Sequence, residues 1–162
     1  MQAVTVIPGK PGSAQLGQVP EPAGELGSVL VQALAVGVCG TDVEIAGGAY
    51  GWPPPGQERL IIGHESLGRG IDPGPSSFAS GEHVVGIVRR PDPLPCANCA
   101  VGEWDMCSNG GYTERGIKQV DGFMADRWRI EPEYAVRVDK QLGVLGVLLE
   151  PTTVVAKAWE TR

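Results

Sequence analysis

Short apolar runs alternate with clusters of turn-forming residues along most of the chain. Runs rich in Val, Ile, Leu or aromatic residues, bounded by Gly, Pro or polar residues, predict short β-strands. The predicted strands are residues 1–8, 29–36, 60–62, 83–88, 123–130 and 134–138. The segments predicted as turns are 9–27, with one short apolar interruption, 51–56 and 72–81. Many short strands joined by frequent turns indicate a barrel or a sandwich.

Helices are predicted at only two places. Thr41 is a suitable N-cap for a short helix over 42–46, which Gly47 and Gly48 would end. Residues 150–162 contain no Gly and carry Pro151 in a first-turn position, as helix starts often do. The fold class expected from this pattern is mainly β with short helices.

Composition narrows the class of protein further. A chain of 162 residues is one domain, and its 24 Gly and 14 Pro with 42% hydrophobic residues suit an ordered, turn-rich β-protein. A net charge of −6 gives no support for nucleic-acid binding. The N-terminus lacks a secretory pattern and no run approaches 18 apolar residues, so we expect a cytoplasmic chain without a membrane partner. In that compartment, clustered cysteines are more often metal ligands than disulfides.

Three segments carry one candidate catalytic metal site. Cys39 lies in Gly-Val-Cys-Gly-Thr-Asp, His64 and Glu65 follow Gly63, and Glu150 precedes Pro151. Thiolate, imidazole and carboxylate are all zinc ligands, and three ligands with one open position are typical of a catalytic zinc. The alternatives are an inert buried thiol for Cys39, a satisfied core histidine for His64 and solvated carboxylates for both glutamates.

The order of these and other motifs resembles the N-terminal half of a zinc-dependent medium-chain alcohol dehydrogenase, most closely the microbial glucose dehydrogenases. The resemblance runs from Val29 to the C-terminus. It rests on GVCGTD (37–42), LIIGHE (60–65), VRR (88–90), CANCAVGEWDMC (96–107), ERGI (114–117), DGFM (121–124) and LEP (149–151). The resemblance implies a GroES-like barrel over residues 1–149, followed at 150–162 by the start of a helix that leads to a nucleotide-binding domain.

That second domain has no counterpart in the sequence. No Gly-x-Gly-x-x-Gly occurs, and no alternating βαβ pattern is present. We therefore expect the substrate- and zinc-binding half of an enzyme, without its Rossmann cofactor domain. The cofactors implied are zinc and NAD(P), the latter bound by the missing domain, and the parent enzyme is expected to be a homo-oligomer.

The resemblance also assigns roles to single residues. Thr41 would relay the proton of the zinc-bound hydroxyl, although it could equally serve only as a helix cap. Glu65 and Glu150 would ligate the catalytic zinc or contact the substrate. Glu114 matches a carboxylate that contacts the sugar, while an exposed loop carboxylate is its alternative. No chemistry is assigned to the Arg89-Arg90 pair, and His83 is interpreted as a surface strand residue.

The loop 89–111 resembles the structural zinc lobe of the same family. Cys96, Cys99 and Cys107 match three of its four cysteines, but the fourth position, 93, is Pro here. A structural zinc requires four ligands, so Asp92 is the tentative fourth ligand, with Glu103 and Asp105 as substitutes. A lobe without metal and a redox-active cysteine cluster remain alternatives.

The function implied is NAD(P)-dependent oxidation of an aldose at C1, with glucose as the first candidate substrate and no activity expected from this chain alone. The alternatives are half of a polyol or amino-alcohol dehydrogenase, or a non-catalytic zinc-binding module. The tryptophans at 52, 104, 128 and 159 are attributed to ordinary packing, with a sugar-stacking platform as the alternative. Phe123 and Met124 are expected in the core or at an interface.

Overall fold

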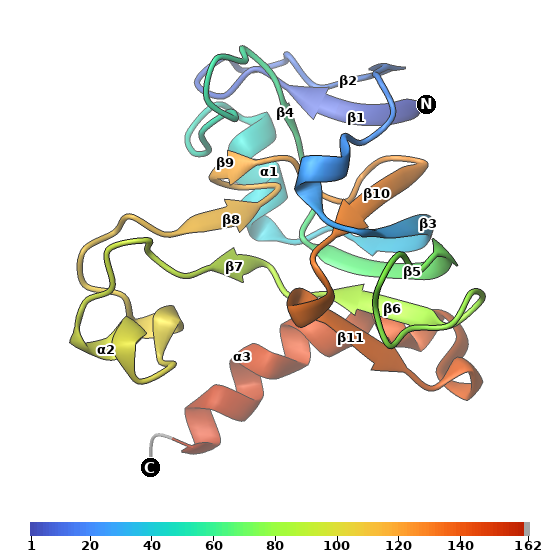
Figure 1. The fold of residues 1–162 in the computed structure, drawn as a ribbon. Coiled ribbons are helices and arrows are strands. Elements are labelled where there is room, and N and C mark those ends of the chain that lie inside the picture. Colours follow the sequence, from blue (N-terminus) through green and yellow to red (C-terminus); the bar gives the residue numbers. More distant parts are fainter. Residues whose placement is uncertain (161–162) are drawn as a thin grey trace.

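A computed structural model of the chain describes residues 1–160. Its framework is three small sheets, in agreement with the mainly β prediction (Figure 1). The largest has five antiparallel strands in the order β10 (Arg127–Ile130), β3 (Val29–Gly37), β5 (Glu65–Asp72), β6 (His83–Gly86) and β11 (Ala135–Val138). The second has the order β2 (Gln15–Gln18), β1 (Gln2–Val6) and β4 (Leu60–Ile61). The third has the order β7 (Arg89–Arg90), β8 (Thr113–Arg115) and β9 (Gln119–Val120).

The helical elements are short and lie outside the sheets. The α-helices are α1 (Gly40–Ala46), α2 (Ala97–Ala100) and α3 (Leu149–Glu160). The 3₁₀ segments are η1 (Gly24–Leu26), η2 (Trp104–Met106), η3 (Pro132–Tyr134) and η4 (Lys140–Leu148). The predicted final helix begins one residue earlier than expected, and its last two residues, 161–162, lie outside the described part of the chain. Figure 1 shows the loop that carries α2 projecting to one side, away from the sheets.

Two hydrophobic clusters hold the sheets together. The larger one fills the inner face of the five-stranded sheet and consists of Val29, Val31, Val84, Phe123, Trp128 and Ile130. Within it, the rings of Phe123 and Trp128 meet edge to face, with centroids 4.7 Å apart. The other cluster joins α1 to the smaller sheets through Val6, Ile45, Leu60, Ile62 and Ile117. Burial of apolar side chains such as these is the main favourable contribution to folding.

Several strands differ from their predicted bounds. The turn segment 9–27 contains a strand, β2, and four further strands, β5, β7, β8 and β9, have no predicted counterpart. The predicted strand 123–130 begins only at Arg127, because Phe123 turns into the core and bonds through its N–H to the carbonyl of Gly63. These differences arise because strand pairing between distant segments, and not local composition, decides where each ladder forms.

The stretch Lys140–Glu160 is long and apolar enough to cross a membrane, judged only by length and composition, which is weak evidence for a span. Gly143 has φ 53° and ψ −136°, so the helix is interrupted there and η4 and α3 are not one continuous rod. Val147 and Leu149 pack against a small buried cluster that contains Leu67, Val85 and Val138. These contacts attach the stretch to the five-stranded sheet.

Candidate active site

Cys39 lies at the junction between β3 and α1. β3 ends at Gly37, and Cys39 is the N-cap of α1, with its backbone N–H donating to Asp42 Oδ2 at 3.0 Å. The expectation that Thr41 caps this helix is therefore wrong. The helix starts two residues earlier than the sequence suggested, so Thr41 lies inside its first turn, and it lines the same cleft as Cys39.

His64 and Glu65 lie at the start of β5, directly across from the end of β3. Gly63 before them has φ 91°, a conformation that glycine adopts without strain, and a side chain there would collide with Met124. Glu65 pairs with Gly37 in the ladder, where a Cβ on Gly37 would come within 1.9 Å of the Glu65 carboxylate. The two glycines thus give the backbone and the carboxylate the room they need.

The structure brings three of the predicted ligands together. The Sγ of Cys39 lies 3.0 Å from Nε2 of His64, and one ligand atom from each of Cys39, His64 and Glu65 falls within 4.8 Å of the others. His64 and Glu65 are buried and Cys39 is half-buried. Thiolate, imidazole and carboxylate converging at this spacing fit zinc in type and arrangement.

Glu150 reaches the same cleft from the first turn of α3. Its carboxylate is not one of the three groups that lie within 4.8 Å of one another. Burial raises the pKa of Glu150, and the neighbouring carboxylate of Glu65 raises it further. Glu150 therefore lies in the same cleft as the cluster without belonging to it, and its predicted role as a zinc ligand or substrate contact stays a prediction.

Asp42 is a site residue that sequence analysis missed. It is 2% exposed, and its Oδ1 lies 3.5 Å from Nδ1 of His64 while accepting a hydrogen bond from the N–H of Gly63 at 3.2 Å. Burial alone would lower the pKa of His64, but Asp42, followed by Cys39 and Glu150, raises it to about 9. Asp42 thus lies at ion-pair distance behind Nδ1 of the imidazole, while Nε2 faces Cys39, and carboxylates commonly occupy this position behind metal-binding histidines.

Glu114 lines the same cleft, which has a volume of about 710 Å³. It is 9% exposed, and its Oε1 accepts two hydrogen bonds from Arg89, from Nε at 2.9 Å and from Nη2 at 2.8 Å. Arg89 also stacks on Tyr112, with its guanidinium carbon 4.0 Å from the ring centroid. Both Arg89 contacts with Glu114 fall on Oε1, so Oε2 is the oxygen left for other hydrogen-bond donors. Arg89, to which the sequence assigned no chemistry, is a positioning residue for Glu114.

The cysteine loop forms a second ligand cluster. The sulfurs of Cys96, Cys99 and Cys107 lie within 4.8 Å of one another. Asp92 is 7% exposed, and its Oδ2 lies 3.9 Å from the sulfur of Cys107. The same carboxylate accepts backbone hydrogen bonds from Leu94 and Gly111, which hold it beside the cysteines. Asp92 therefore lies beside the cysteines but outside the group whose ligand atoms all fall within 4.8 Å of one another, and its role as the fourth zinc ligand stays a prediction.

The remaining candidates take no part in these clusters. Both substitutes for Asp92 bind Lys157: Glu103 directly and Asp105 at 3.4 Å. Half-buried His83 belongs to neither group of potential ligands found among the described residues. Within the described part of the chain no tryptophan lines the cleft, and Trp128 is buried in the core. Phe123 is also fully buried, as predicted.

A β-rich domain with a Cys/His/Glu cleft and a cysteine lobe has the features of a zinc-liganding catalytic domain. A profile of the alcohol dehydrogenase GroES-like domain matches residues 25–140. The chain belongs to this family, which confirms the GroES-like fold predicted from the sequence motifs.

Several similar proteins are named glucose dehydrogenases. The chain is 42% identical over 162 residues to a glucose 1-dehydrogenase of Methanocella arvoryzae, with 99% of this chain and 45% of the relative aligned. It is 43% identical over 166 residues to the glucose 1-dehydrogenase of Thermoproteus tenax, and the alignment covers 99% of this chain and 45% of that relative. Among solved structures, glucose dehydrogenase of Haloferax mediterranei in complex with NADP, Zn and gluconolactone superimposes with a TM-score of 0.88 at 35% identity. The superposition covers 99% of this chain and 45% of the Haloferax chain. The chain thus spans about half the length of these relatives.

Proposed function

We propose that this chain supplies the zinc- and sugar-binding half of an NAD(P)-dependent dehydrogenase that oxidises an aldose at C1, with glucose as the preferred substrate. The observation that carries the proposal is the approach of Cys39 Sγ to His64 Nε2 at 3.0 Å, beside Glu65 and in one cleft with Glu114. The names of the relatives, glucose 1-dehydrogenases from several archaea, support the same substrate.

Cys39, His64 and Glu65 would hold the catalytic zinc, with Glu150 beside them. When bound, zinc supplies Lewis acidity that makes a sugar hydroxyl easier to deprotonate. His64 must be unprotonated at Nε2 to act as a ligand, and the carboxylate of Asp42 would then face the N–H that remains at Nδ1. The metal therefore depends on Asp42 for the orientation of its imidazole ligand.

Thr41 and Glu114 would act on the substrate. The hydroxyl of Thr41, in the first turn of α1, would accept the proton of the C1 hydroxyl and pass it outward. Oε2 of Glu114 would accept hydrogen bonds from ring hydroxyls, while Arg89 fixes the carboxylate through Oε1. A carboxylate held in this way favours a polyhydroxy substrate over an aliphatic alcohol.

Asp92, Cys96, Cys99 and Cys107 would hold a second zinc with a structural role. Their loop lies between β7 and β8, the strands that carry Arg89 and Glu114, and the two residues are partners in that ladder. A metal in the lobe would therefore fix the loop that links the two residues. This arrangement suits a site whose function is to stabilise the local fold.

The test of this function is a fusion of the chain to the nucleotide-binding half of the Methanocella arvoryzae relative. We expect zinc-dependent reduction of NAD or NADP with glucose, and no reduction by the 162-residue chain alone. Sorbitol, threonine and ethanol serve as comparison substrates. A folded, zinc-loaded fusion that oxidises sorbitol or threonine better than glucose would move the assignment to a polyol or amino-alcohol dehydrogenase, and no oxidation of any substrate would favour a non-catalytic zinc-binding module.

A further inference from the structure

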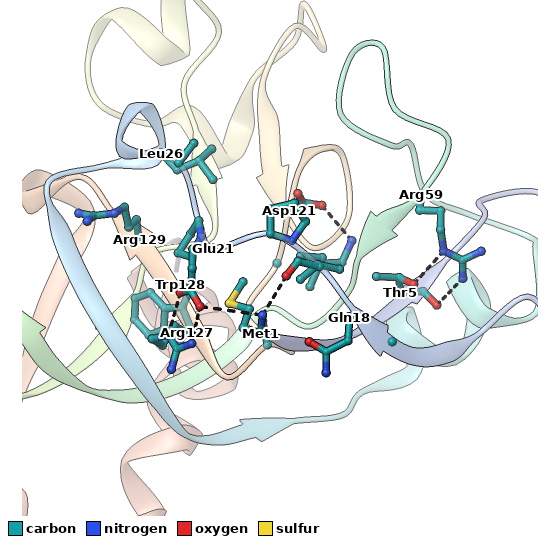
Figure 2. A pocket seen from close by; sticks show the side chains of 18 of the residues that line it. Met1, Thr5, Gln18, Glu21, Leu26, Arg59, Asp121, Arg127, Trp128 and Arg129 are labelled. Atoms are coloured by element: carbon teal, nitrogen blue, oxygen red, sulfur yellow. Dashed lines mark hydrogen bonds and ion pairs between the residues drawn. The ribbon is translucent and has the colours of Figure 1, made fainter.

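A second cavity lies on another part of the domain, between the β1–β2 hairpin, the segment 19–26 and β10 (Figure 2). Its volume is about 430 Å³, within the range of small-molecule sites. None of its lining residues also lines the zinc cleft. Any ligand of this cavity would therefore bind separately from the substrate of the zinc cleft.

Positive charge dominates the walls of this cavity. The arginines that line it are Arg59, Arg115, Arg127 and Arg129, and the acids are Glu21 and Asp121. Glu21 is already paired with Arg127. Asp121 accepts a hydrogen bond from the N–H of Ile61 at 2.9 Å, and burial raises its pKa. A local excess of positive charge stands out in a chain whose net charge is −6.

Two of the arginines have no acidic partner. Arg59 bonds to the hydroxyl and carbonyl of Thr5 and to the carbonyl of Ser13, and Arg129 bonds only to the carbonyls of Gly27 and Ser28. Within residues 1–160 no carboxylate forms an ion pair with either guanidinium. Figure 2 shows them on opposite sides of the view, with Asp121 and Met1 between them.

The cavity also contains buried donors that lack acceptors. Arg115 and Trp128 each line it and are each 2% exposed. Neither Nε of Arg115 nor Nε1 of Trp128 has a hydrogen-bond partner in the described chain. Burial and the neighbouring charge of Arg90 lower the pKa of Arg115 to about 10, while Glu131, 3.4 Å away and shared with Arg90, acts in the opposite direction. A buried donor without an acceptor is costly, so an acceptor supplied by a ligand would stabilise this part of the fold.

We propose that this cavity binds a small anion that carries carboxylate or phosphate groups. The guanidinium groups of Arg59 and Arg129 provide charge-assisted hydrogen bonds, and planar guanidinium suits both carboxylate and phosphate oxygens. The volume admits a molecule several times larger than inorganic phosphate, so the ligand carries further atoms between its charged groups. This site is independent of the proposed sugar oxidation.

Titration of the chain with inorganic phosphate and with citrate tests the proposal and separates the two chemistries. Binding is measured by calorimetry and by the indole N–H resonance of Trp128 in ¹⁵N spectra, assigned with Trp128→Phe. We expect saturable binding of at least one probe, with a shift of that resonance. Arg59→Gln and Arg129→Gln should each weaken binding roughly tenfold or more, the factor for loss of a charge-assisted hydrogen bond.

Arg137→Gln is the matched control, because it removes the same charge from β11, where Arg137 pairs with Glu82 outside the cavity. We expect Arg137→Gln to bind the anion with unchanged affinity. The zinc content of Arg59→Gln, Arg129→Gln and Arg137→Gln should equal that of the wild-type chain. Comparable weakening by Arg137→Gln would show non-specific charge attraction and overturn the proposal. Absence of saturable binding of either probe below roughly 10 mM to the folded wild-type chain would overturn it as well. Neither outcome would affect the assignment of the zinc cleft.

Discussion

Asp42 contacts both residues on which the zinc cleft depends: its Oδ1 lies 3.5 Å from Nδ1 of His64, and its Oδ2 accepts the backbone N–H of Cys39 at 3.0 Å. A single buried carboxylate therefore positions the imidazole and fixes the turn that carries the thiol. Removing it disturbs two ligands at once, although Asp42 itself touches no metal in the proposed arrangement.

We predict that Asp42→Asn weakens zinc binding in the cleft by roughly 10- to 100-fold, the usual effect of losing a carboxylate behind a histidine ligand. Zinc in the cysteine loop should be retained. Elemental analysis after dialysis against graded chelator measures both sites. Asp126→Asn is the control, since this exposed carboxylate also accepts a backbone hydrogen bond, from Gln2. Equal zinc retention in the two variants would contradict the role given to Asp42.

Zinc binding at the cleft should depend on pH because His64 carries a proton in the metal-free chain. Its pKa is raised from 6.5 to about 9, and zinc requires the neutral imidazole. Affinity should therefore fall by about tenfold for each pH unit below 9 from this group alone. Calorimetry in buffers of different ionisation enthalpy should detect the released proton, and His64→Ala should abolish this contribution.

The raised pKa of His64 also makes the stability of the metal-free chain depend on pH, but stability should fall with rising pH, whereas zinc affinity should rise. A raised folded-state pKa means that protonated His64 stabilises the fold fully below pH 6.5, and that this contribution is lost as the pH rises through about 9. Urea unfolding in the presence of chelator should show decreasing stability over that window. In His64→Ala the decrease over that window should be smaller, and an unchanged pH dependence would contradict the assignment.

Arg89 and Glu114 should act as one unit in sugar recognition. Glu114→Ala should lower kcat/KM on aldoses by roughly 10- to 100-fold in the fused enzyme, since charged hydrogen bonds contribute about 1.5–3 kcal/mol each. Arg89→Met should lower it in the same direction, and the double variant should be little worse than Glu114→Ala alone. Zinc content should not change, and a simple alcohol should be affected much less. Additive losses would show that the two residues act independently.

The cysteine loop offers a test of its fourth ligand. Asp92→Ala should release zinc from the loop while the Cys39 site stays filled. Asp105→Ala is the control, because Asp105 has the same charge and lies in the same loop but pairs with Lys157. Retention of loop zinc with unchanged affinity in Asp92→Ala would transfer the role to another ligand or to water.

Metal-free protein should show unequal cysteine reactivity in this loop. Hydrogen bonds from the backbone of Cys99 and from Ser108 lower the pKa of Cys96 to about 5, whereas burial raises the pKa of Cys99. Cys96 is then a thiolate at neutral pH and should react with iodoacetamide before Cys99. Mass spectrometry of briefly alkylated protein measures the order, and added zinc should protect both residues. Faster labelling of Cys99 would contradict the described geometry.

Local sequence predicted some elements well and others not at all. The run 29–36 is rich in β-branched and apolar residues, and it forms β3 almost as expected. β5 escaped prediction because Glu65–Asp72 mixes two glycines with charged residues, and it becomes a strand through pairing with β3 on one side and β6 on the other. Such pairing depends on segments far away in the chain, which no short window contains.

In the candidate site, too, local sequence predicted some residues and could not predict others. Cys39, His64 and Glu65 were found because each ligand type stands near a glycine and fits a known motif. Asp42 was missed because an acid in the first turn of a helix is ordinary, and only the fold reveals that it meets His64. Arg89 was missed because its partner lies 25 residues away, beyond the cysteine loop.

Neighbouring residues of β8 belong to different cavities: Glu114 lines the zinc cleft and Arg115 lines the arginine-rich one. One residue inserted into this strand would send a guanidinium toward the metal ligands and a carboxylate toward the proposed anion site. By contrast, residues 91–112 can change in length without exchanging the two side chains, provided that Arg89 still pairs with Glu114. For protein engineering, the loop positions outside the proposed zinc ligands are therefore the adjustable part, and the three residues of β8 are fixed.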